Sequence, residues 1–140
     1  MEKIIKINNQ RETEDFGREL ASGAKPGTVI ALMGDLGTGK TTLTQAIAEN
    51  LGVKEPVTSP TFTILQEYKS GRLPLYHFDV YRIADPEDMW ELGYEEYFYG
   101  DGVCVVEWAD RIQELLPEDA IRVSLEYGPS PGERKYTCRY

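Results

Sequence analysis

The sequence predicts an α/β domain in three layers, with a mixed β-sheet flanked by helices. Two observations lead to this fold class. The apolar runs at residues 29–33 and 103–106 contain no polar alternation, and segments with helical periodicity lie between them. A strand without polar alternation is usually covered on both faces, as the inner strands of parallel sheets are. A chain of 140 residues has the size of one domain, which we place at residues 1–140.

Composition narrows the classes of function. The net charge is −9, with 41% hydrophobic and 28% charged residues, a globular composition. Binding to nucleic acid depends on clustered lysine and arginine, whereas here the acidic residues cluster, so we expect no large direct contact with nucleic acid. We find neither a membrane-spanning segment nor a signal-peptide core and expect a cytoplasmic protein. Cys104 and Cys138 lack the spacing of a zinc or redox site and are expected to be reduced thiols.

The elements of the first half follow from capping and periodicity. Residues 4–7 form a short strand. Asn9 and Glu12 then resemble a capping box, and Phe16 and Leu20 share the inner face of the helix that follows. After a turn at residues 25–27 comes the apolar strand 29–33. A helix over 41–51 follows it and stops at Gly52.

The second half is richer in strands. Residues 61–68 and 73–81 are predicted strands of a hairpin, because turn-forming residues separate them. A helix is expected to open at Pro86 and reach about Phe98, weakened by Gly93. Its predicted inner face carries Trp90, Tyr94, Tyr97 and Phe98. The strand 103–106, a short helix over 109–116, and strands 121–127 and 136–140 complete the chain.

A phosphate-binding loop is the strongest signal in the sequence. Residues 34–41, GDLGTGKT, match G-x-x-x-x-G-K-[ST] in full, between an apolar strand and a helical pattern. Glycines let the backbone N–H groups curl around phosphates, and the helix presents its positive end to them. Lys40 is expected to reach the β- and γ-phosphates, and the Thr41 hydroxyl to ligate Mg²⁺. The predicted nucleotide contacts of this segment are Asp35, Leu36, Gly37, Thr38, Gly39, Lys40, Thr41 and Thr42. The fold is therefore expected to be a P-loop NTPase-like domain.

A second protein ligand for Mg²⁺ should stand at the end of another strand. Glu107 follows the apolar strand 103–106, and Asp79 follows the more alternating segment 75–78. Because the wholly apolar strand suits a central position beside the loop strand, we assign Glu107 to the metal. Asp79 then orients the attacking water or contacts metal-bound water.

The loop alone leaves several classes open. No N-K-x-D string for guanine occurs, which favours ATP or leaves the base undecided. A small-molecule kinase would usually add an arginine-rich lid, and no dense arginine segment follows the loop helix. Two alternatives remain beside an ATPase: a small-molecule kinase, and a nucleotide-dependent binding module in which hydrolysis is incidental.

Four motifs in order resemble the TsaE (YjeE) family of small bacterial P-loop ATPases, over essentially the whole chain. The matching segments are residues 34–42, Ser59-Pro60-Thr61-Phe62, His77-Phe78-Asp79-Val80-Tyr81-Arg82 and Val106-Glu107-Trp108. The family commonly has alanine where Thr38 stands. Since both are small, this departure changes little.

The resemblance implies slow ATP hydrolysis in the service of a partner complex. TsaB- and TsaD-like proteins would be the partners, transferring threonylcarbamoyl to the tRNA adenosine next to the anticodon, with tRNA an indirect partner. It also implies site residues. Thr61 would be a switch-loop threonine that senses the γ-phosphate and metal, Asp79 the functional aspartate and Glu107 the Mg²⁺-linked glutamate. Trp108 and Asp110 would line the nucleotide pocket, and Gln10 would help to cover the purine.

Two features remain outside these motif roles. The single histidine, His77, is interpreted as a structural group on a hairpin strand. Residues 85–101 combine acidic and aromatic side chains, and no lysine or arginine occurs between Arg82 and Arg111. Because aromatic residues are enriched at interfaces, this stretch is our candidate for docking a protein partner.

Overall fold

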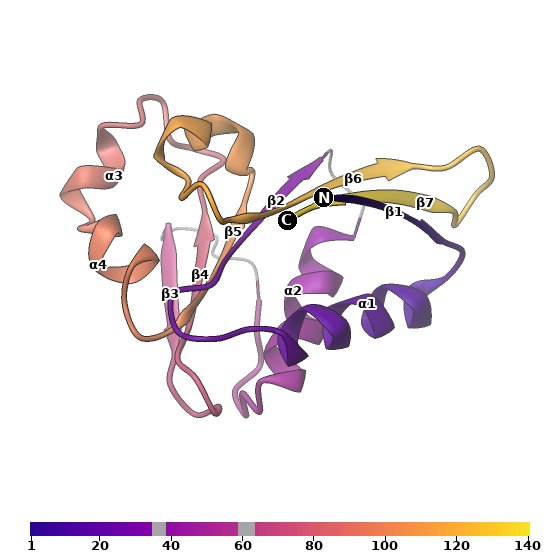
Figure 1. Ribbon diagram of the computed structural model, residues 1–140, viewed down its shortest axis with the longest axis horizontal. Coiled ribbons are helices and arrows are strands. Elements are labelled where there is room, and N and C mark those ends of the chain that lie inside the picture. Colours follow the sequence, from indigo (N-terminus) through magenta and orange to yellow (C-terminus); the bar gives the residue numbers. More distant parts are fainter. Residues whose placement is uncertain (35–38, 59–63) are drawn as a thin grey trace.

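A seven-stranded mixed β-sheet forms the middle layer of the protein (Figure 1). The computed structural model describes residues 1–34, 39–58 and 64–140. The strands are β1 (Glu2–Ile7), β2 (Val29–Gly34), β3 (Leu65–Tyr68), β4 (Leu75–Asp79), β5 (Val103–Glu107), β6 (Ile121–Tyr127) and β7 (Arg134–Arg139). They are arranged in the order β1-β7-β6-β2-β5-β4-β3. The parallel pairs are β2 with β5, β2 with β6, and β4 with β5, while β1–β7, β6–β7 and β3–β4 are antiparallel.

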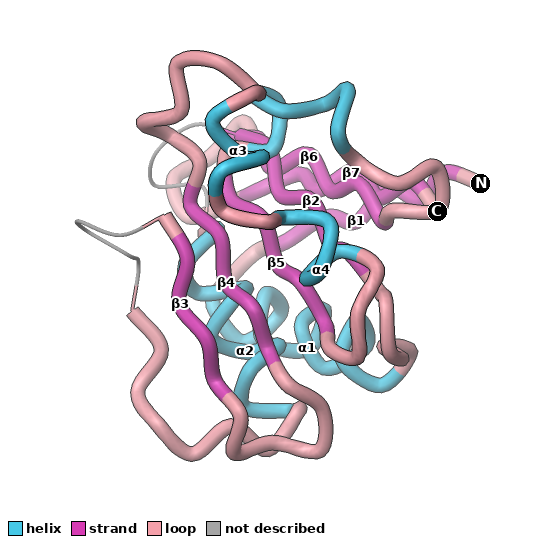
Figure 2. Tube along the Cα trace, turned by 90° about the vertical axis from the view of Figure 1, so that its left-hand side faces the viewer, coloured by secondary structure: helices cyan, strands magenta, loops and turns pink. Residues whose placement is uncertain are grey.

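Helices cover the sheet on both faces, which confirms the three-layer prediction. The helices are α1 (Gln10–Ser22), α2 (Lys40–Asn50), α3 (Asp88–Glu91), α4 (Tyr94–Phe98) and the 3₁₀ helix η1 (Ala109–Leu115). Turning the molecule by 90° puts α3 and α4 in front of β4 and β5, with α1 and α2 behind them (Figure 2). The helices α1 and α2 thus cover one face, and α3, α4 and η1 cover the other (Figures 1 and 2).

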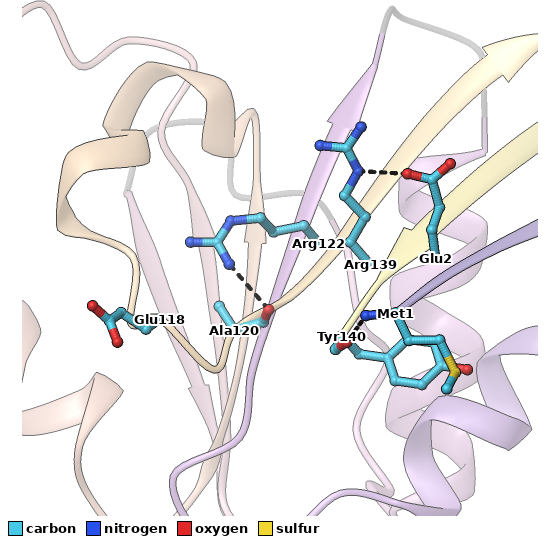
Figure 3. Close-up of a pocket in the computed structure, with 7 residues that line it drawn as sticks. All are labelled: Met1, Glu2, Glu118, Ala120, Arg122, Arg139 and Tyr140. Atoms are coloured by element: carbon cyan, nitrogen blue, oxygen red, sulfur yellow. Dashed lines mark hydrogen bonds and ion pairs between the residues drawn. The ribbon is translucent and has the colours of Figure 1, made fainter.

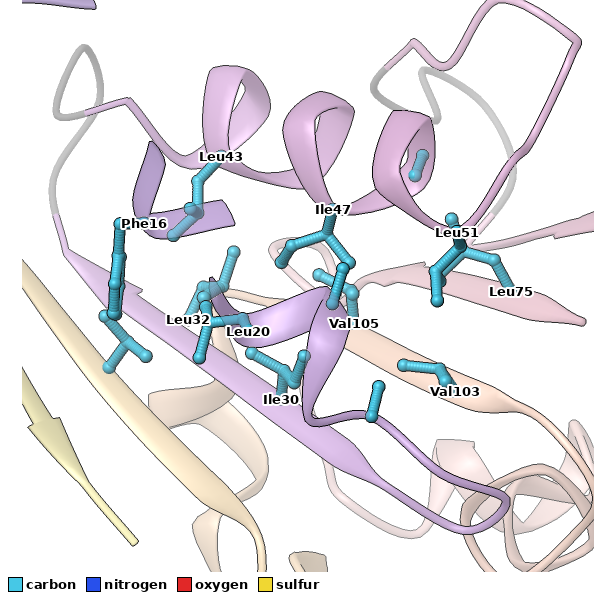
Figure 4. Packing of buried hydrophobic residues seen from close by; sticks show 14 of the residues in the cluster. Phe16, Leu20, Ile30, Leu32, Leu43, Ile47, Leu51, Leu75, Val103 and Val105 are labelled. Atoms are coloured by element: carbon cyan, nitrogen blue, oxygen red, sulfur yellow. The ribbon is translucent and has the colours of Figure 1, made fainter. Parts of the chain in front are cut away.

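The loop strand β2 is buried on both faces, as its lack of polar alternation predicts. Ile30 and Leu32 pack into the cluster on the α1–α2 side, together with Leu43 and Ile47 of α2 (Figure 4). Val29 and Ala31 of the same strand belong to the cluster under α3, α4 and η1. Successive residues of a strand point to opposite faces, so β2 contributes to both cores. The sheet therefore holds β2 firmly where its last residue enters the loop.

The helix α1 begins at the predicted cap. The Asn9 side chain accepts a hydrogen bond from the Glu12 backbone N–H at 3.0 Å. The Glu12 carboxylate accepts in turn from the backbone N–H of Asn8 at 2.9 Å, one residue earlier than in the usual capping box. The start of α1 is fixed by both bonds.

The helices α1 and α2 approach closely at a glycine. A Cβ atom built on Gly17 would lie 2.5 Å from the Cβ of Ala46, which is too close for two carbon atoms. The absence of a side chain at Gly17 lets α1 lie against the helix that follows the phosphate loop.

The predicted helix over residues 86–98 is a correction: it is two short helices, α3 and α4. Gly93 has a φ of 69°, in the left-handed region that glycine adopts readily, and the helix breaks there. The break also changes the predicted inner face. Tyr94 and Phe98 are buried, whereas Trp90 is 63% exposed.

Several strand bounds also differ from the prediction. The described part of the first hairpin strand begins at Leu65, and predicted residues 61–63 lie outside the described ranges. The second ends at Asp79, whose carboxylate accepts from the Tyr81 backbone N–H at 3.1 Å and turns the chain away from the sheet. The last strand begins at Arg134.

The cysteines behave as predicted, because both are free and buried. Burial raises the pKa of Cys104 to about 12. No helix among the residues described here is long and apolar enough to cross a membrane.

Candidate functional site

Three neighbouring parallel strands end at the same edge of the sheet. Gly34 ends β2, Asp79 ends β4 and Glu107 ends β5. In the strand register Asp79 lies opposite Glu107, and Glu107 lies opposite Leu32, two residues before Gly34. The carboxyl ends of parallel strands are where open α/β sheets bind ligands. Topology therefore places both predicted carboxylates at the edge where β2 ends and the predicted phosphate loop begins.

The two ends of this loop are glycines for steric reasons. Gly34 has a φ of 149°, and a Cβ atom there would lie 2.3 Å from the carbonyl oxygen of Leu125. Gly39, the N-cap of α2, has a φ of 100°, and its Cβ would lie 2.7 Å from the hydroxyl of Tyr136. Both glycines let the backbone turn where a side chain would collide. Residues 35–38, predicted to contact the nucleotide, lie outside the described ranges.

Lys40 is the first residue of α2 and is held inside the site. It is only 5% exposed, and its Nζ donates to the carbonyl of Gly34. The same Nζ lies 3.5 Å from the ring centroid of Trp108, which is a cation–π contact. Trp108 has a φ of 62°, unusual for a residue with a side chain, and its ring packs against that of Tyr81 at a tilt of 53°, with 4.8 Å between the centroids. The predicted lysine and tryptophan are thus in direct contact.

Glu107 is a buried carboxylate with a buried partner. It is 3% exposed, and its Oε2 lies 2.5 Å from the Nε2 of His77. His77 is fully buried, and its second ring nitrogen, Nδ1, has no hydrogen-bond partner among the described residues. The interpretation of His77 as a structural group overlooked this contact. The sequence did contain one indication of this contact. His77 lies two residues before Asp79, and residues i and i+2 of a strand share a face, so both point to the same side of the sheet.

Asp79 lies in a different electrostatic setting. Partial burial raises the pKa of its carboxyl, and the nearby charge of Glu107 raises it further. The hydrogen bond from the Tyr81 backbone lowers this pKa, as do His77 and Lys40. The net effect is a raised pKa, so the folded protein disfavours the charged form of Asp79, although the charge of Lys40 partly opposes this.

This raised pKa gives a pH-dependent prediction for stability. Since the folded pKa lies above the unfolded value, stability is fully present below the ordinary pKa of 3.8 and falls as the pH rises through the folded pKa. Asp79→Asn removes this loss and keeps an oxygen for the Tyr81 N–H. We expect the variant to be more stable than the parent at pH 7, with the gain shrinking toward pH 4; because solvent screens this partly exposed carboxyl, the gain is small, about 0.5 kcal/mol or about 2 °C in Tm. Denaturant unfolding of both proteins across this range measures the difference.

Asp85→Asn is the matched control. Asp85 is exposed, and its carboxylate accepts in the same way from a backbone N–H two residues on, that of Glu87, at 2.9 Å. This substitution should leave stability unchanged at every pH. A gain for Asp79→Asn that is as large at pH 4 as at pH 7 would contradict the electrostatic cause.

The other predicted residues are more scattered. Thr41 and Thr42 lie in the first turn of α2 and are half-buried. Asp110 is exposed in the first turn of η1, directly after Trp108 and Ala109. Gln10 is exposed at the start of α1, where its amide donates to Glu14 at 3.1 Å. Thr61 lies outside the described residues.

The donor set fits Mg²⁺ bound together with phosphates. This ion prefers oxygen ligands, keeps several waters and usually takes one or two protein carboxylates beside substrate phosphates. Glu107 and Asp79 supply two carboxylates at adjacent strand ends, and Thr41 supplies a hydroxyl at the start of α2. Within the described ranges, no three histidine, cysteine or acidic side chains form a ready-made metal cluster. The described groups could hold the ion with a nucleotide.

A separate hollow of about 490 Å³ lies on the other half of the sheet (Figure 3). Arg122 and Arg139 line it, and Arg139 is paired with Glu2 at 3.0 Å. None of the predicted site residues lines it.

Comparisons with known proteins extend over nearly the whole chain. The family model described as "Threonylcarbamoyl adenosine biosynthesis protein TsaE" matches residues 7–136. A Bacillus subtilis (strain 168) protein named tRNA threonylcarbamoyladenosine biosynthesis protein TsaE is 51% identical over 118 residues, covering 84% of this chain and 73% of its own. The protein of that name from Treponema pallidum (strain Nichols) is 44% identical over 115 residues, covering 82% and 84%. The crystal structure of Bacillus subtilis YdiB matches with a TM-score of 0.82 and 43% identity, over 99% of this chain and 84% of that one.

Proposed function

The chain belongs to the TsaE family of threonylcarbamoyl adenosine biosynthesis proteins, and from this premise we propose that it is a Mg²⁺-dependent ATPase of that pathway, working in the cytoplasm. One observation carries the proposal. The buried Lys40 begins the helix after a complete phosphate-loop sequence, and two carboxylates end the adjacent strands beside it. P-loop NTPases use this combination of a cation, a loop and a metal-binding carboxylate for phosphoryl transfer.

Each residue has a stated part in this proposal. Lys40 and the backbone N–H groups of residues 35–39 bind the phosphates. Thr41 and Glu107 hold Mg²⁺, which when bound neutralises negative charge on the phosphate oxygens. Asp79 and Thr61 orient the attacking water.

The remaining predicted residues enclose the nucleotide. Trp108, whose ring lies against the Lys40 ammonium, closes one side of the phosphate region. Thr42 and Asp110 border the site, and Gln10 covers the purine. The whole of residues 1–140 acts as one ATPase domain.

The pathway is tested in the cell of origin. Depleting the protein should lower the threonylcarbamoyl adenosine content of bulk tRNA, measured by nucleoside mass spectrometry. The parent protein should restore the content and Lys40→Ala should not. Unchanged content after verified depletion would contradict the role in this pathway, and a screen for phosphoryl transfer to small acceptors would then be the next step.

For the partners, we propose TsaB- and TsaD-like proteins that transfer threonylcarbamoyl to tRNA, with residues 85–101 as the docking surface. Trp90 and Tyr99 on this surface are 63% and 65% exposed. Exposed acidic side chains surround them on α3, on α4 and on the segments beside these helices: Asp85, Glu87, Asp88, Glu91, Glu95, Glu96 and Asp101. Such a surface suits a partner face that carries lysine and arginine.

Charge reversal tests this surface. Glu87→Lys, Glu91→Lys and Glu95→Lys together should weaken binding to the purified partner complex by about tenfold or more, mainly through slower association at low salt. Binding kinetics at two salt concentrations measure the effect. The control variant carries lysine in place of the exposed Glu49, Glu118 and Asp119, so its net charge changes by the same amount away from this surface. Equal loss in both triple variants would show a general charge effect and no defined docking surface.

A further inference from the structure

A buried histidine–carboxylate pair lies behind the nucleotide edge of the sheet. His77 on β4 and Glu107 on β5 belong to adjacent parallel strands, with Val105 opposite His77 and Glu107 opposite Asp79. The side chains of His77 and Glu107 are 0% and 4% exposed, and His77 Nε2 lies 2.5 Å from Glu107 Oε2. The two residues therefore meet diagonally across the strand pair, on one face of the sheet.

Part of the surroundings of His77 is apolar. Besides Asp79 and Glu107, its neighbours on the same face of the two strands are Leu75, Val103 and Val105, all fully buried in the cluster under α1 and α2. A leucine or valine at position 77 would continue this cluster, but it would leave the buried Glu107 Oε2 without this hydrogen bond. A buried histidine instead brings two polar nitrogens, each of which needs a partner.

Within the described ranges, the two ring nitrogens differ in their contacts. The Nε2 contacts Glu107, while Nδ1 has no hydrogen-bond partner among the described residues. A carboxylate accepts, so Nε2–H is the donor in this contact. An apolar side chain would serve packing better, because a buried ring nitrogen needs a partner and costs folding free energy without one. The bond to Glu107 is the contact that the histidine adds.

We propose that His77 is a positioning residue that fixes the carboxylate of Glu107 for its work on Mg²⁺. It acts through the Nε2–H···Oε2 bond and touches neither nucleotide nor metal. With Oε2 engaged by the imidazole, Oε1 would be the carboxylate oxygen left for Mg²⁺. The inference rests on the proposed role of Glu107, and it follows the general observation that partners behind a metal ligand set its orientation and affinity.

Two amides of different length test the bond. The glutamine side chain places its N–H₂ near the position of histidine Nε2, whereas that of asparagine reaches only the position of Nδ1. The experiment is to measure Mn²⁺ affinity by electron paramagnetic resonance in the presence of a non-hydrolysable ATP analogue. It compares the full-length parent protein with His77→Gln and His77→Asn. Analogue affinity without metal and the thermal unfolding midpoint are measured for the same proteins.

The expected result separates the two variants. His77→Asn should weaken Mn²⁺ binding by about 10- to 100-fold, and His77→Gln should remain within about threefold of the parent. Analogue affinity without metal should change by no more than about twofold in either. Parent-like Mn²⁺ affinity in His77→Asn, or equal loss in both variants, would overturn the proposal. If His77→Asn does not fold, His77→Leu supplies the donor-free variant, since it matches the apolar neighbours.

Glu107→Gln distinguishes failure of this inference from failure of the proposed function. If Glu107→Gln loses Mn²⁺ affinity while His77→Asn keeps it, only the role of His77 is wrong. If the parent protein and Glu107→Gln bind Mn²⁺ alike, the metal role of Glu107 is wrong and that of His77 falls with it. In the expected case, adding His77→Asn to Glu107→Gln causes no further loss, because both act on the same contact.

Discussion

Lys40→Ala should remove measurable binding of ATP, with a loss in affinity of about 100-fold or more. Lys40 is 5% exposed, and its ammonium contacts the carbonyl of Gly34 and the ring of Trp108, at the start of α2. A phosphate in the loop would meet this charge in a partly desolvated place, where its attraction is much stronger than in water. Calorimetric titration with ATP, followed by a phosphate-release assay, measures binding and turnover in turn.

The control for Lys40→Ala is the removal of a lysine at the protein surface. Lys69 is exposed and lies 4.0 Å from Glu67, so Lys69→Ala removes the same charge from a solvated position. It should bind ATP like the parent. If Lys40→Ala binds and hydrolyses ATP like the parent, phosphate binding in the loop does not depend on this lysine and the assignment is wrong.

Glu107→Gln should lower the turnover of ATP by about 100-fold or more while changing ATP affinity in the absence of metal by no more than about threefold. The amide has nearly the shape of the carboxylate and keeps an oxygen that can accept from His77 Nε2–H. It loses the charge that would hold Mg²⁺. Because the metal neutralises charge that develops during phosphoryl transfer, the loss should fall on kcat.

Two further substitutions complete this test. Glu118→Gln removes a carboxylate from an exposed position outside the site and should leave kcat unchanged. Glu107→Ala removes the carboxylate altogether and should cut turnover more than binding. ATP hydrolysis by Glu107→Ala at the parent rate would exclude Glu107 as the metal ligand.

The fold was largely predictable because its decisive elements carry strong local patterns. The fully apolar runs at 29–33 and 103–106 could only be strands covered on both faces, and they lie side by side as β2 and β5. The cap at Asn9 likewise depends on neighbouring residues alone. By contrast, the break at Gly93 depends on a backbone angle that the aromatic pattern of residues 86–98 concealed.

The arrangement of the site was less accessible, since it depends on which strands pair and in which register. The two carboxylates could be assigned to strand ends, but the pairing of Asp79 with Glu107 and the contact of His77 with Glu107 arise between strands far apart in sequence. The contact of Lys40 with Trp108 likewise joins residues far apart in sequence, and no pattern indicated the left-handed backbone at Trp108. Most of these residues could be identified from the sequence, but the contacts between them could not.

The position of β2 also has a consequence for how the protein folds. Its two neighbours in the sheet are β5 and β6. Val29 therefore pairs with Cys104, and Ile30 with Ile121, residues that follow much later in the chain. Contacts of such sequence separation slow folding, because a long loop must close before they form. A nascent chain that ends before β5 would expose an apolar strand with both edges unpaired, a state prone to aggregation. We therefore expect the chain to bind nucleotide only once the sheet is complete. Bound ATP would then stabilise the fully folded protein alone.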